Sequence, residues 1–145
     1  MTDSERTNLI AAALKAREHA HAPYSHFRVG AALRANSGRV FTGCNIENST
    51  FGLTLCAERV AVFKALSEGE RGFNAVAVVA DTERLTPPCG ACRQILWEFC
   101  RDAEVILANL GGQMTVRRMP DLFPDAFDGS FFLIAAVRNR PRNRK

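Results

Sequence analysis

The chain has 145 residues, of which 47% are hydrophobic and 23% are charged, and its net charge at pH 7 is +4. This length suits one domain with a substantial core, and the ordinary composition excludes a disordered or fibrous protein. Five basic residues lie in residues 138–145, and the other 137 residues hold 14 basic and 15 acidic groups. Because the body of the chain is not basic, we expect no nucleic-acid partner.

Two helices and a hairpin are predicted in the first half of the chain. Apolar residues at helical spacing predict a helix over residues 3–20, with Ser4 as its N-cap. Residues 29–35 and 39–45 are apolar segments around a short polar turn, which is typical of two hairpin strands. Residues 56–69 predict a second, strongly apolar helix that ends at a glycine.

The second half of the chain alternates strands with one helix. Buried strands are predicted over residues 75–81 and 104–110, and the helix between them spans residues 89–101, after two prolines that suit a helix start. Residues 113–119 predict a last strand. Strand, helix and strand in this order indicate a parallel pair with a right-handed crossover. The sequence therefore predicts a single α/β domain with a mixed sheet.

The longest strongly apolar run near the end, residues 131–137, is too short to span a bilayer, so we expect no membrane partner. The N-terminus carries acidic residues before any apolar stretch, which is unlike a signal peptide. We therefore expect a cytoplasmic protein. In that reducing compartment, the five cysteines would be thiols or metal ligands rather than disulfides.

Three cysteines lie at the starts of the two later helices. Cys56 begins one of them, and Cys89 and Cys92 share one face of the first turn of the other. A helix N-terminus favours a thiolate, because its free N–H groups and its dipole attract negative charge. If the two helix starts converge, three thiolates meet. Three protein ligands with one open position are typical of a catalytic zinc site.

The two remaining cysteines are not expected to join this site. Cys100 follows Cys89 by eleven residues, which is about 16 Å along a helix. Cys44 lies at the end of a strand and suits the role of a small buried hydrophobic residue. None of the three histidines has zinc-ligand spacing to another ligand.

Glu58 lies two residues after Cys56, in the first turn of an otherwise apolar helix. Taken alone, it could simply interact favourably with the helix dipole. Beside a zinc ion that binds water, however, a carboxylate can accept a proton and pass it on. Arg59 and Arg93 follow the ligand-bearing turns and could offset the negative charge of three thiolates by donating to sulfur. The order C-x-E and then P-C-x-x-C is the signature of zinc-dependent deaminases.

The segments PYSHFRVGAAL, GCNIEN, LTLCAERVAVFKALSEG and PCGACRQIL occur in this order and together resemble the small cytidine deaminases of nucleoside salvage. The resemblance runs from near the N-terminus to Phe127. It implies a three-layer α/β/α sandwich around a five-stranded mixed sheet, assembled as a homotetramer. It also implies one zinc ion per chain on Cys56, Cys89 and Cys92, with Glu58 as the proton shuttle.

The resemblance further implies a set of substrate contacts. Asn45 and Glu47 match residues that bind the ribose hydroxyls in that family, and Phe27 matches a residue that flanks the base. The backbone N–H of Ala57 would meet the pyrimidine O2, and the backbone carbonyl of Pro87 would accept from the 4-amino group. Proline keeps its carbonyl oxygen, so this last role is open to it.

The end of the chain departs from the family pattern. Phe127 matches an aromatic residue that the family places in a neighbouring subunit's pocket. We therefore expect one domain over residues 1–128 and an extension over residues 129–145, first apolar and then basic. The apolar part, residues 131–137, could add an edge strand or pack against a neighbouring subunit.

The implied reaction is the zinc-dependent hydrolysis of cytidine or 2′-deoxycytidine to uridine or deoxyuridine and ammonia, in pyrimidine salvage. A carboxylate at Glu47 suits a free 3′-hydroxyl better than a 3′-phosphate, because like charges repel. Three alternatives stay open at this point. They are a deaminase of another nucleoside-like substrate, a structural-zinc module that binds nucleic acid through its basic tail, and a thiol redox protein that uses Cys89 and Cys92.

Overall fold

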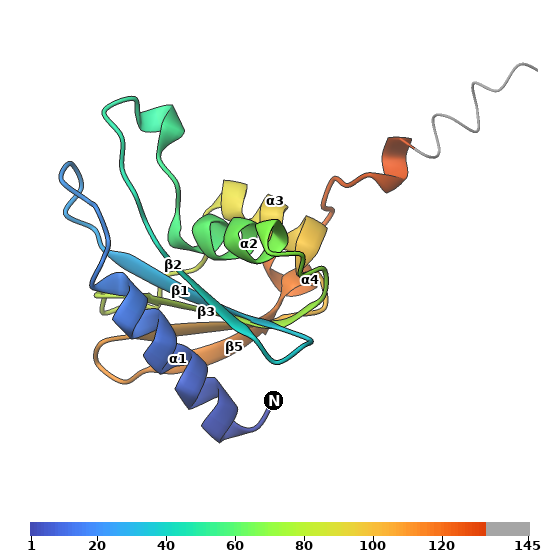
Figure 1. Ribbon diagram of the computed structural model, residues 1–145, viewed down its shortest axis with the longest axis horizontal. Helices are drawn as coiled ribbons and strands as arrows, with labels where there is room; N and C mark the ends of the chain where they lie inside the picture. Colours follow the sequence, from blue (N-terminus) through green and yellow to red (C-terminus); the bar gives the residue numbers. More distant parts are fainter. Residues whose placement is uncertain (133–145) are drawn as a thin grey trace, which may run out of the picture.

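A computed structural model describes residues 1–132 of the chain (Figure 1). Its helices and strands are α1 (Asp3–Arg17), β1 (Val29–Ala35), β2 (Val40–Cys44), η1 (Phe51–Leu53), α2 (Ala57–Ser67), β3 (Phe73–Ala80), α3 (Gly90–Phe99), β4 (Glu104–Asn109), β5 (Met114–Arg118) and α4 (Met119–Leu122). The sequence pattern predicts all of these except the two short helices η1 and α4. Among residues 1–132, no helix has the length and apolar character needed to cross a bilayer.

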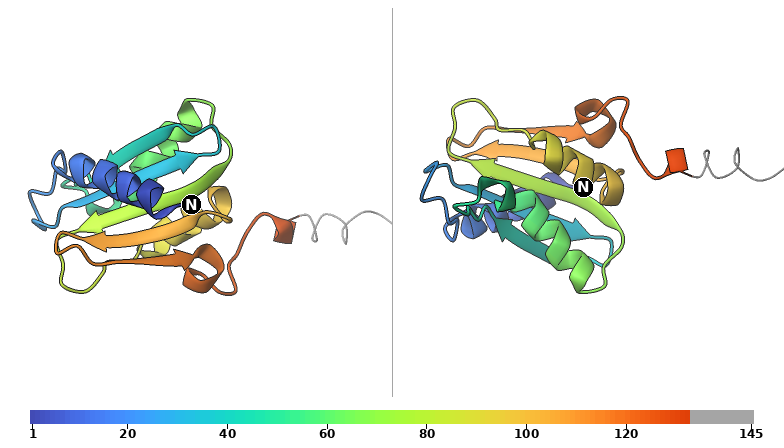
Figure 2. Two further views of the ribbon diagram at one scale, coloured as in Figure 1. Left: turned by 90° about the horizontal axis from the view of Figure 1, so that it is seen from below. Right: turned by 90° about the horizontal axis from the view of Figure 1, so that it is seen from above.

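The centre of the molecule is a five-stranded sheet with the strand order β2-β1-β3-β4-β5. β3 and β4 run parallel, as predicted, and the other neighbouring strands are antiparallel. Helix α1 covers one face of the sheet, and α2 and α3 lie side by side on the other (Figures 1 and 2). The predicted three-layer α/β/α sandwich with a mixed sheet is therefore confirmed.

The two faces of the sheet bury two separate apolar cores. On the α1 face, Leu9 and Ala13 pack near Ala77 and Ile106, and small side chains let this helix approach the strands closely. On the other face, the larger core includes Leu96 of α3. Because both faces are covered, β3 is buried along nearly its whole length and reads as a continuous apolar run.

Helix α1 begins at Asp3, as predicted, but its N-cap differs from the prediction. Its N-cap is Thr2, not Ser4, because Thr2 and Glu5 form a reciprocal capping box. The Thr2 hydroxyl accepts from the Glu5 backbone N–H at 3.2 Å, and the Glu5 carboxylate accepts from the Thr2 backbone N–H at 2.8 Å. The helix also ends at Arg17 instead of continuing to residue 20, and the chain then pairs His21 with the end of the hairpin.

Gly43 lets α2 lie directly on the backbone of β2. A Cβ atom at this position would be 2.4 Å from the carbonyl oxygen of Ala57 and 2.6 Å from the backbone nitrogen of Ala61. Both distances are far below van der Waals contact. The absence of a side chain at Gly43 therefore fixes the height of α2 over the sheet, and with it the position of Cys56 at the start of the helix.

Residues 124–132 leave the body of the domain as an arm (Figures 1 and 2). Asp128 anchors the arm by accepting from Trp97 Nε1 at 3.1 Å and from Arg101 at 2.7 Å. Residues 130–132 are helical, so this beginning of the apolar segment does not form an edge strand. The remainder of the segment and the basic tail lie outside the described residues.

Candidate metal centre and adjoining cavity

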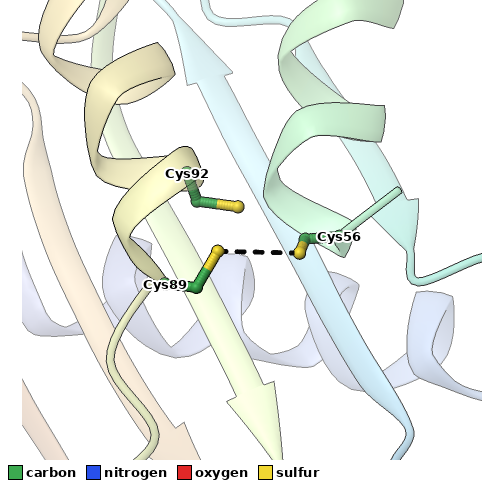
Figure 3. A group of neighbouring side chains, drawn as sticks. All are labelled: Cys56, Cys89 and Cys92. Atoms are coloured by element: carbon green, nitrogen blue, oxygen red, sulfur yellow. Dashed lines mark hydrogen bonds between the residues drawn. The ribbon is translucent and has the colours of Figure 1, made fainter. Parts of the chain in front are cut away.

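Helices α2 and α3 begin next to each other, and three cysteine sulfurs point into the space between their first turns (Figure 3). The sulfurs of Cys56, Cys89 and Cys92 all lie within 4.8 Å of one another. The Cys56 and Cys89 sulfurs are 3.8 Å apart. Within residues 1–132, no other cluster of three or more histidine, cysteine or acidic side chains has this geometry.

The local backbone directs the three thiols toward one another. Cys56 and Cys89 are the N-cap residues of their helices and have extended backbones, with ψ values of 155° and 169°. Neither side chain caps its own helix. Each residue instead starts its helix with its backbone carbonyl, which accepts from Val60 in α2 and from Arg93 in α3. The thiols are therefore free to face the gap between the helices.

The pKa values of Cys56 and Cys92 are shifted in opposite directions. The pKa of Cys56 is lowered to about 5, chiefly by a hydrogen bond from the Cys92 thiol and to a smaller extent by the guanidinium of Arg59. The same bond to Cys56, together with burial, raises the pKa of Cys92 far above its ordinary value. Like charges this close cannot all form without a cation between them. Three converging sulfurs are a donor set that fits Zn²⁺ and leaves one position for a ligand that is not protein.

Glu58 is the acidic residue closest to this cluster along the chain, and only 5% of it is exposed. Burial raises the pKa of its carboxyl group to about 7, and the nearby Cys56 thiolate adds to the shift. A carboxyl group with a pKa near neutrality can both accept and donate a proton at physiological pH. This is the property expected of a proton shuttle, and the structure puts Glu58 beside the sulfurs.

A cavity of about 210 Å³ adjoins the cysteine cluster, and Cys56, Cys89 and Glu58 form part of its lining. The lining also contains five residues that the family resemblance relates to substrate: Phe27, Asn45, Glu47, Ala57 and Pro87. These residues come from the loop before β1, the segment after β2 and the starts of α2 and α3. The fold thus brings together residues that are far apart in the chain, such as Phe27 and Cys89, which are 62 positions apart.

Arg59 and Arg93 have different surroundings. Arg59 Nη2 donates to the Cys56 sulfur at 3.6 Å and to the carbonyl oxygen of Thr54 at 3.0 Å. Arg93 instead donates to the carbonyl oxygens of Pro88 and Leu122, at 2.8 and 2.7 Å. Among the hydrogen bonds of the described residues, only Arg59 thus reaches a sulfur as expected. Arg93 instead joins the loop before α3 to the end of α4, because the carbonyl oxygens of Pro88 and Leu122 lie within its reach.

Phe127 does not line this cavity. It lies on the C-terminal arm, 53% exposed, where its ring stacks on Phe131 with the centroids 5.5 Å apart. The side-chain amide of Gln94 donates to its backbone carbonyl at 2.9 Å. A contact between Phe127 and a neighbouring subunit therefore stays a prediction.

Sequence reasoning gave no role to Ser25, Thr54 or Thr86, which also line the cavity. Ser25 had a usable signal. It lies two residues before Phe27 in a proline-containing turn, where a serine hydroxyl commonly bonds to the backbone two residues further on. The threonines carry no comparable signal, because threonine is common in exposed loops for other reasons.

The family model for the zinc-binding region of cytidine and deoxycytidylate deaminases matches residues 3–109. A cytidine deaminase from Halalkalibacterium halodurans is 54% identical over 124 residues, which cover 85% of this chain and 94% of that protein. One from Sporosarcina psychrophila is 55% identical over 120 residues, or 82% of this chain and 88% of that protein. The crystal structure of a cytidine deaminase from Burkholderia pseudomallei superimposes with a TM-score of 0.83 at 52% identity, covering 88% of this chain and all of that one.

Proposed function

The chain belongs to the zinc-dependent cytidine and deoxycytidylate deaminase family, and we propose that its substrate is free cytidine or 2′-deoxycytidine. The products are uridine or deoxyuridine and ammonia. One observation carries the proposal: the cavity beside the three sulfurs also contains a buried carboxyl group, Glu58. A structural zinc site would need a fourth protein ligand, and residues 1–132 bring none to the cluster.

Cys56, Cys89 and Cys92 are the residues that would hold the zinc ion. Zinc bound there supplies Lewis acidity, which makes water a nucleophile near neutral pH. Glu58 takes the proton from the attacking water and delivers it to N3 of the base. The water oxygen bonds to C4 of the base, and the same carboxyl group then carries the second proton of that oxygen to the 4-amino nitrogen. The C4–N bond breaks as the C4 carbonyl forms, and ammonia leaves. Burial supports this role, because it brings the pKa of Glu58 to about 7.

Backbone groups at the two helix starts would orient the base. The first N–H groups of a helix have no partner within it, so the N–H of Ala57 at the start of α2 can donate to the pyrimidine O2. The carbonyl oxygen of Pro87 can accept from the 4-amino group, while Phe27 packs on the ring. Both polar contacts are made by main-chain atoms, which lose little entropy when they bind.

The charge of the cavity favours an unphosphorylated nucleoside. Glu47 and Glu58 both line it. Hydrogen bonds from the Ser25 hydroxyl and from nearby backbone N–H groups keep the pKa of Glu47 below its ordinary value. A phosphate close to the ionised Glu47 would be repelled. We therefore propose a role in pyrimidine salvage, which handles free nucleosides, in the cytoplasm, where thiol ligands stay reduced.

We further propose that the chain assembles as a homotetramer. Large apolar side chains are exposed near the cavity and on the arm, among them Phe51 at 70%, Leu53 at 67% and Phe127 at 53%. Exposed apolar groups of this size favour burial against another chain. In such an assembly Phe127 would cover the cavity of a neighbouring subunit.

The test of the proposed function is turnover by purified protein with a measured zinc content. Ammonia release and the ultraviolet change are followed with cytidine, cytosine and cytidine monophosphate in parallel. We expect turnover of cytidine, little or none of the other two, and about one zinc ion per chain. Zinc without turnover of cytidine would contradict the proposal and support a structural metal site.

A further inference from the structure

Ser25 links two residues that the proposed function assigns to the substrate. The Ser25 hydroxyl donates to Glu47 Oε1, and the hydroxyl oxygen of Ser25 accepts from the backbone N–H of Phe27 at 3.0 Å. One hydroxyl thus contacts both the carboxylate that would bind the ribose and the main chain of the residue that would flank the base. All three residues line the cavity.

The carboxylate of Glu47 is held almost entirely by the loop before β1. Oε2 accepts from the backbone N–H groups of Tyr24 and Ser25, at 2.8 and 3.2 Å. The Ser25 hydroxyl is the one side-chain donor that the described residues bring to Oε1. Because Glu47 and Ser25 are 22 residues apart in sequence, this arrangement depends on the tertiary fold.

Phe27 is fixed on its other side by Asn45. The side-chain amide of Asn45 donates to the carbonyl oxygen of Phe27 at 2.7 Å, and its Oδ1 accepts from the backbone N–H of Val29 at 2.9 Å. Between Ser25 and Phe27, His26 has a backbone φ of 56°, which lies in the left-handed region that residues other than glycine seldom adopt. Hydrogen bonds on both sides of Phe27 therefore hold a strained turn in place.

We propose that Ser25 is a positioning residue for nucleoside recognition, which orients the Glu47 carboxylate toward the ribose 3′-hydroxyl and fixes the backbone of Phe27. This inference rests on the proposed function. The backbone N–H groups of Tyr24 and Ser25 hold the carboxylate in place, and the Ser25 hydroxyl fixes the direction of Oε1. A carboxylate oriented before binding loses less entropy when it accepts from a ribose hydroxyl. Ser25 therefore acts on substrate binding and not on the proton transfers of Glu58.

The first test compares Ser25→Ala with the wild type. Loss of one hydrogen bond to a charged group is expected to raise KM for cytidine roughly tenfold. The value of kcat should stay within about twofold, since Glu58 and the cysteines are unchanged. Ser25→Thr keeps the hydroxyl and should restore most of the affinity, which a purely space-filling role of Ser25 would not predict.

The second test asks whether the effect passes through Glu47. In the wild type, 2′-deoxycytidine should be preferred over 2′,3′-dideoxycytidine, which lacks the 3′-hydroxyl. Ser25→Ala should reduce this preference. In a protein that already carries Glu47→Ala, the added Ser25→Ala substitution should leave the preference unchanged. Equal preferences in the wild type and Ser25→Ala would overturn the proposal.

Ser37 offers a matched control outside the cavity. Its hydroxyl also donates to a glutamate, Glu70, at 2.7 Å, and also accepts from the backbone N–H two residues later, that of Arg39, at 3.5 Å. Ser37→Ala should leave KM for cytidine unchanged. If Ser25→Ala does not fold, Ser25→Cys replaces the hydroxyl by a weaker donor of similar size and enters the same comparison.

The two proposals fail in different ways. A wild-type protein that does not turn over cytidine contradicts the proposed function, and the role of Ser25 falls with it. A wild-type protein that turns over cytidine, with Ser25→Ala equal to it in KM and in 3′-hydroxyl preference, contradicts the role of Ser25 alone. A tenfold rise in KM that Ser25→Thr reverses supports both.

Discussion

Among residues 1–132, Glu58 is the one carboxyl-bearing side chain that is almost completely buried. Burying a carboxyl group costs free energy, because the charged form loses its hydration. An apolar side chain at this position would stabilise the fold without that desolvation cost. The burial of Glu58 beside three thiols and a cavity is therefore best explained by a role in chemistry.

Replacing Glu58 tests this explanation with little change of shape. Glu58→Gln keeps the side-chain volume and removes the group that can carry protons. We expect zinc content to stay at the wild-type level and kcat to fall by at least about 100-fold. Metal analysis and steady-state kinetics on the same preparation check this. Turnover within tenfold of the wild type, at full zinc content, would remove Glu58 from the proton-transfer role.

Arg59 places a positive charge against the sulfur of Cys56. Because three thiolates over-neutralise one Zn²⁺ ion, removal of this donor should weaken metal binding or activity by roughly 10- to 100-fold. Arg59→Ala is compared with Arg71→Ala, since Arg71 donates to two backbone carbonyls at the end of α2, away from the cluster. Zinc affinity by chelator competition and kcat of the zinc-loaded protein should fall in Arg59→Ala alone.

At the scale of elements, the metal centre depends on how two helices rest on the sheet. The start of α2 carries Cys56, and its height is set by Gly43 on β2, where a side chain would collide with the helix backbone. The start of α3 carries the other two cysteines. Arg93 of α3 anchors it by donating to the carbonyl oxygen of Pro88 in the loop before the helix. Small backbone shifts at either contact would separate the sulfurs.

Gly43→Ala should therefore damage both stability and metal binding. The added methyl group meets helix backbone at 2.4 Å and cannot be accommodated by a side-chain rotation. We expect a loss of about 1–3 kcal/mol in the free energy of unfolding, together with weaker zinc binding. Gly52→Ala, where an added Cβ meets open space, is the control and should unfold like the wild type. Urea denaturation of both variants measures the difference.

The arm offers a pH-dependent contact that a single tryptophan can report. Hydrogen bonds from Ser130 and Trp97 lower the pKa of Asp128 well below its ordinary value of 3.8. Because folding lowers the pKa of Asp128, its carboxylate stabilises the folded arm fully at any pH above the ordinary pKa. This stabilisation is lost as the pH falls through the lowered pKa. We therefore expect the arm to stay anchored at neutral pH and to loosen only in acid.

Fluorescence of Trp97, the only tryptophan in the chain, follows this release. In the wild type the emission should change only when the pH falls below about 4. Asp128→Asn should show the released spectrum already at pH 7, because it weakens the bonds to Trp97 and Arg101. Asp121→Asn removes a carboxylate that pairs with Arg118 and should leave the spectrum unchanged. Identical emission of all three proteins at pH 7 would contradict the anchoring role.

At the scale of the whole molecule, the open cavity and the exposed arm are complementary features. The domain proposed over residues 1–128 includes Phe127 at its end, and the arm of residues 124–132 projects from the body of the domain (Figure 2). Phe127 is not among the residues that line the chain's own cavity. The ring of Phe127 stacks on Phe131 of its own chain but stays 53% exposed, so its remaining surface is available for burial against another chain. The proposed homotetramer would supply that surface.

Subunit mixing tests this arrangement. Phe127→Ala should lower kcat/KM, and a Glu58→Gln subunit should be nearly inactive on its own. If Phe127 covers a neighbouring cavity, a Glu58→Gln subunit can supply its intact Phe127 to the cavity of a Phe127→Ala subunit. An equal mixture of the two variants should then be more active than the average of the two separate variants at the same total chain concentration. Sedimentation equilibrium should give about four times the chain mass of 16.0 kDa. A monomer, or no gain on mixing, would contradict a shared active site.

Much of the fold follows from local patterns in the sequence. The bounds of β1 agree with the prediction, the other predicted strands and α2 and α3 are right to within two residues at each end, and the parallel pairing of β3 and β4 is confirmed. These features depend on apolar spacing and on turn residues close together in the chain. For the same reason, the sequence placed Cys56, Cys89 and Cys92 at helix starts, and the order of these residues with Glu58 indicated a zinc-dependent deaminase.

Only the tertiary structure decided which groups meet. It brings the starts of α2 and α3 together, assigns Arg59 to a sulfur but Arg93 to carbonyl oxygens, and joins Ser25 to Glu47 across 22 residues. An arginine or serine has many possible partners of similar energy, and its choice depends on which one the fold brings within about 3 Å. Spacing along the chain determines the helix and strand that carry a residue, whereas packing of these elements determines what that residue can bind.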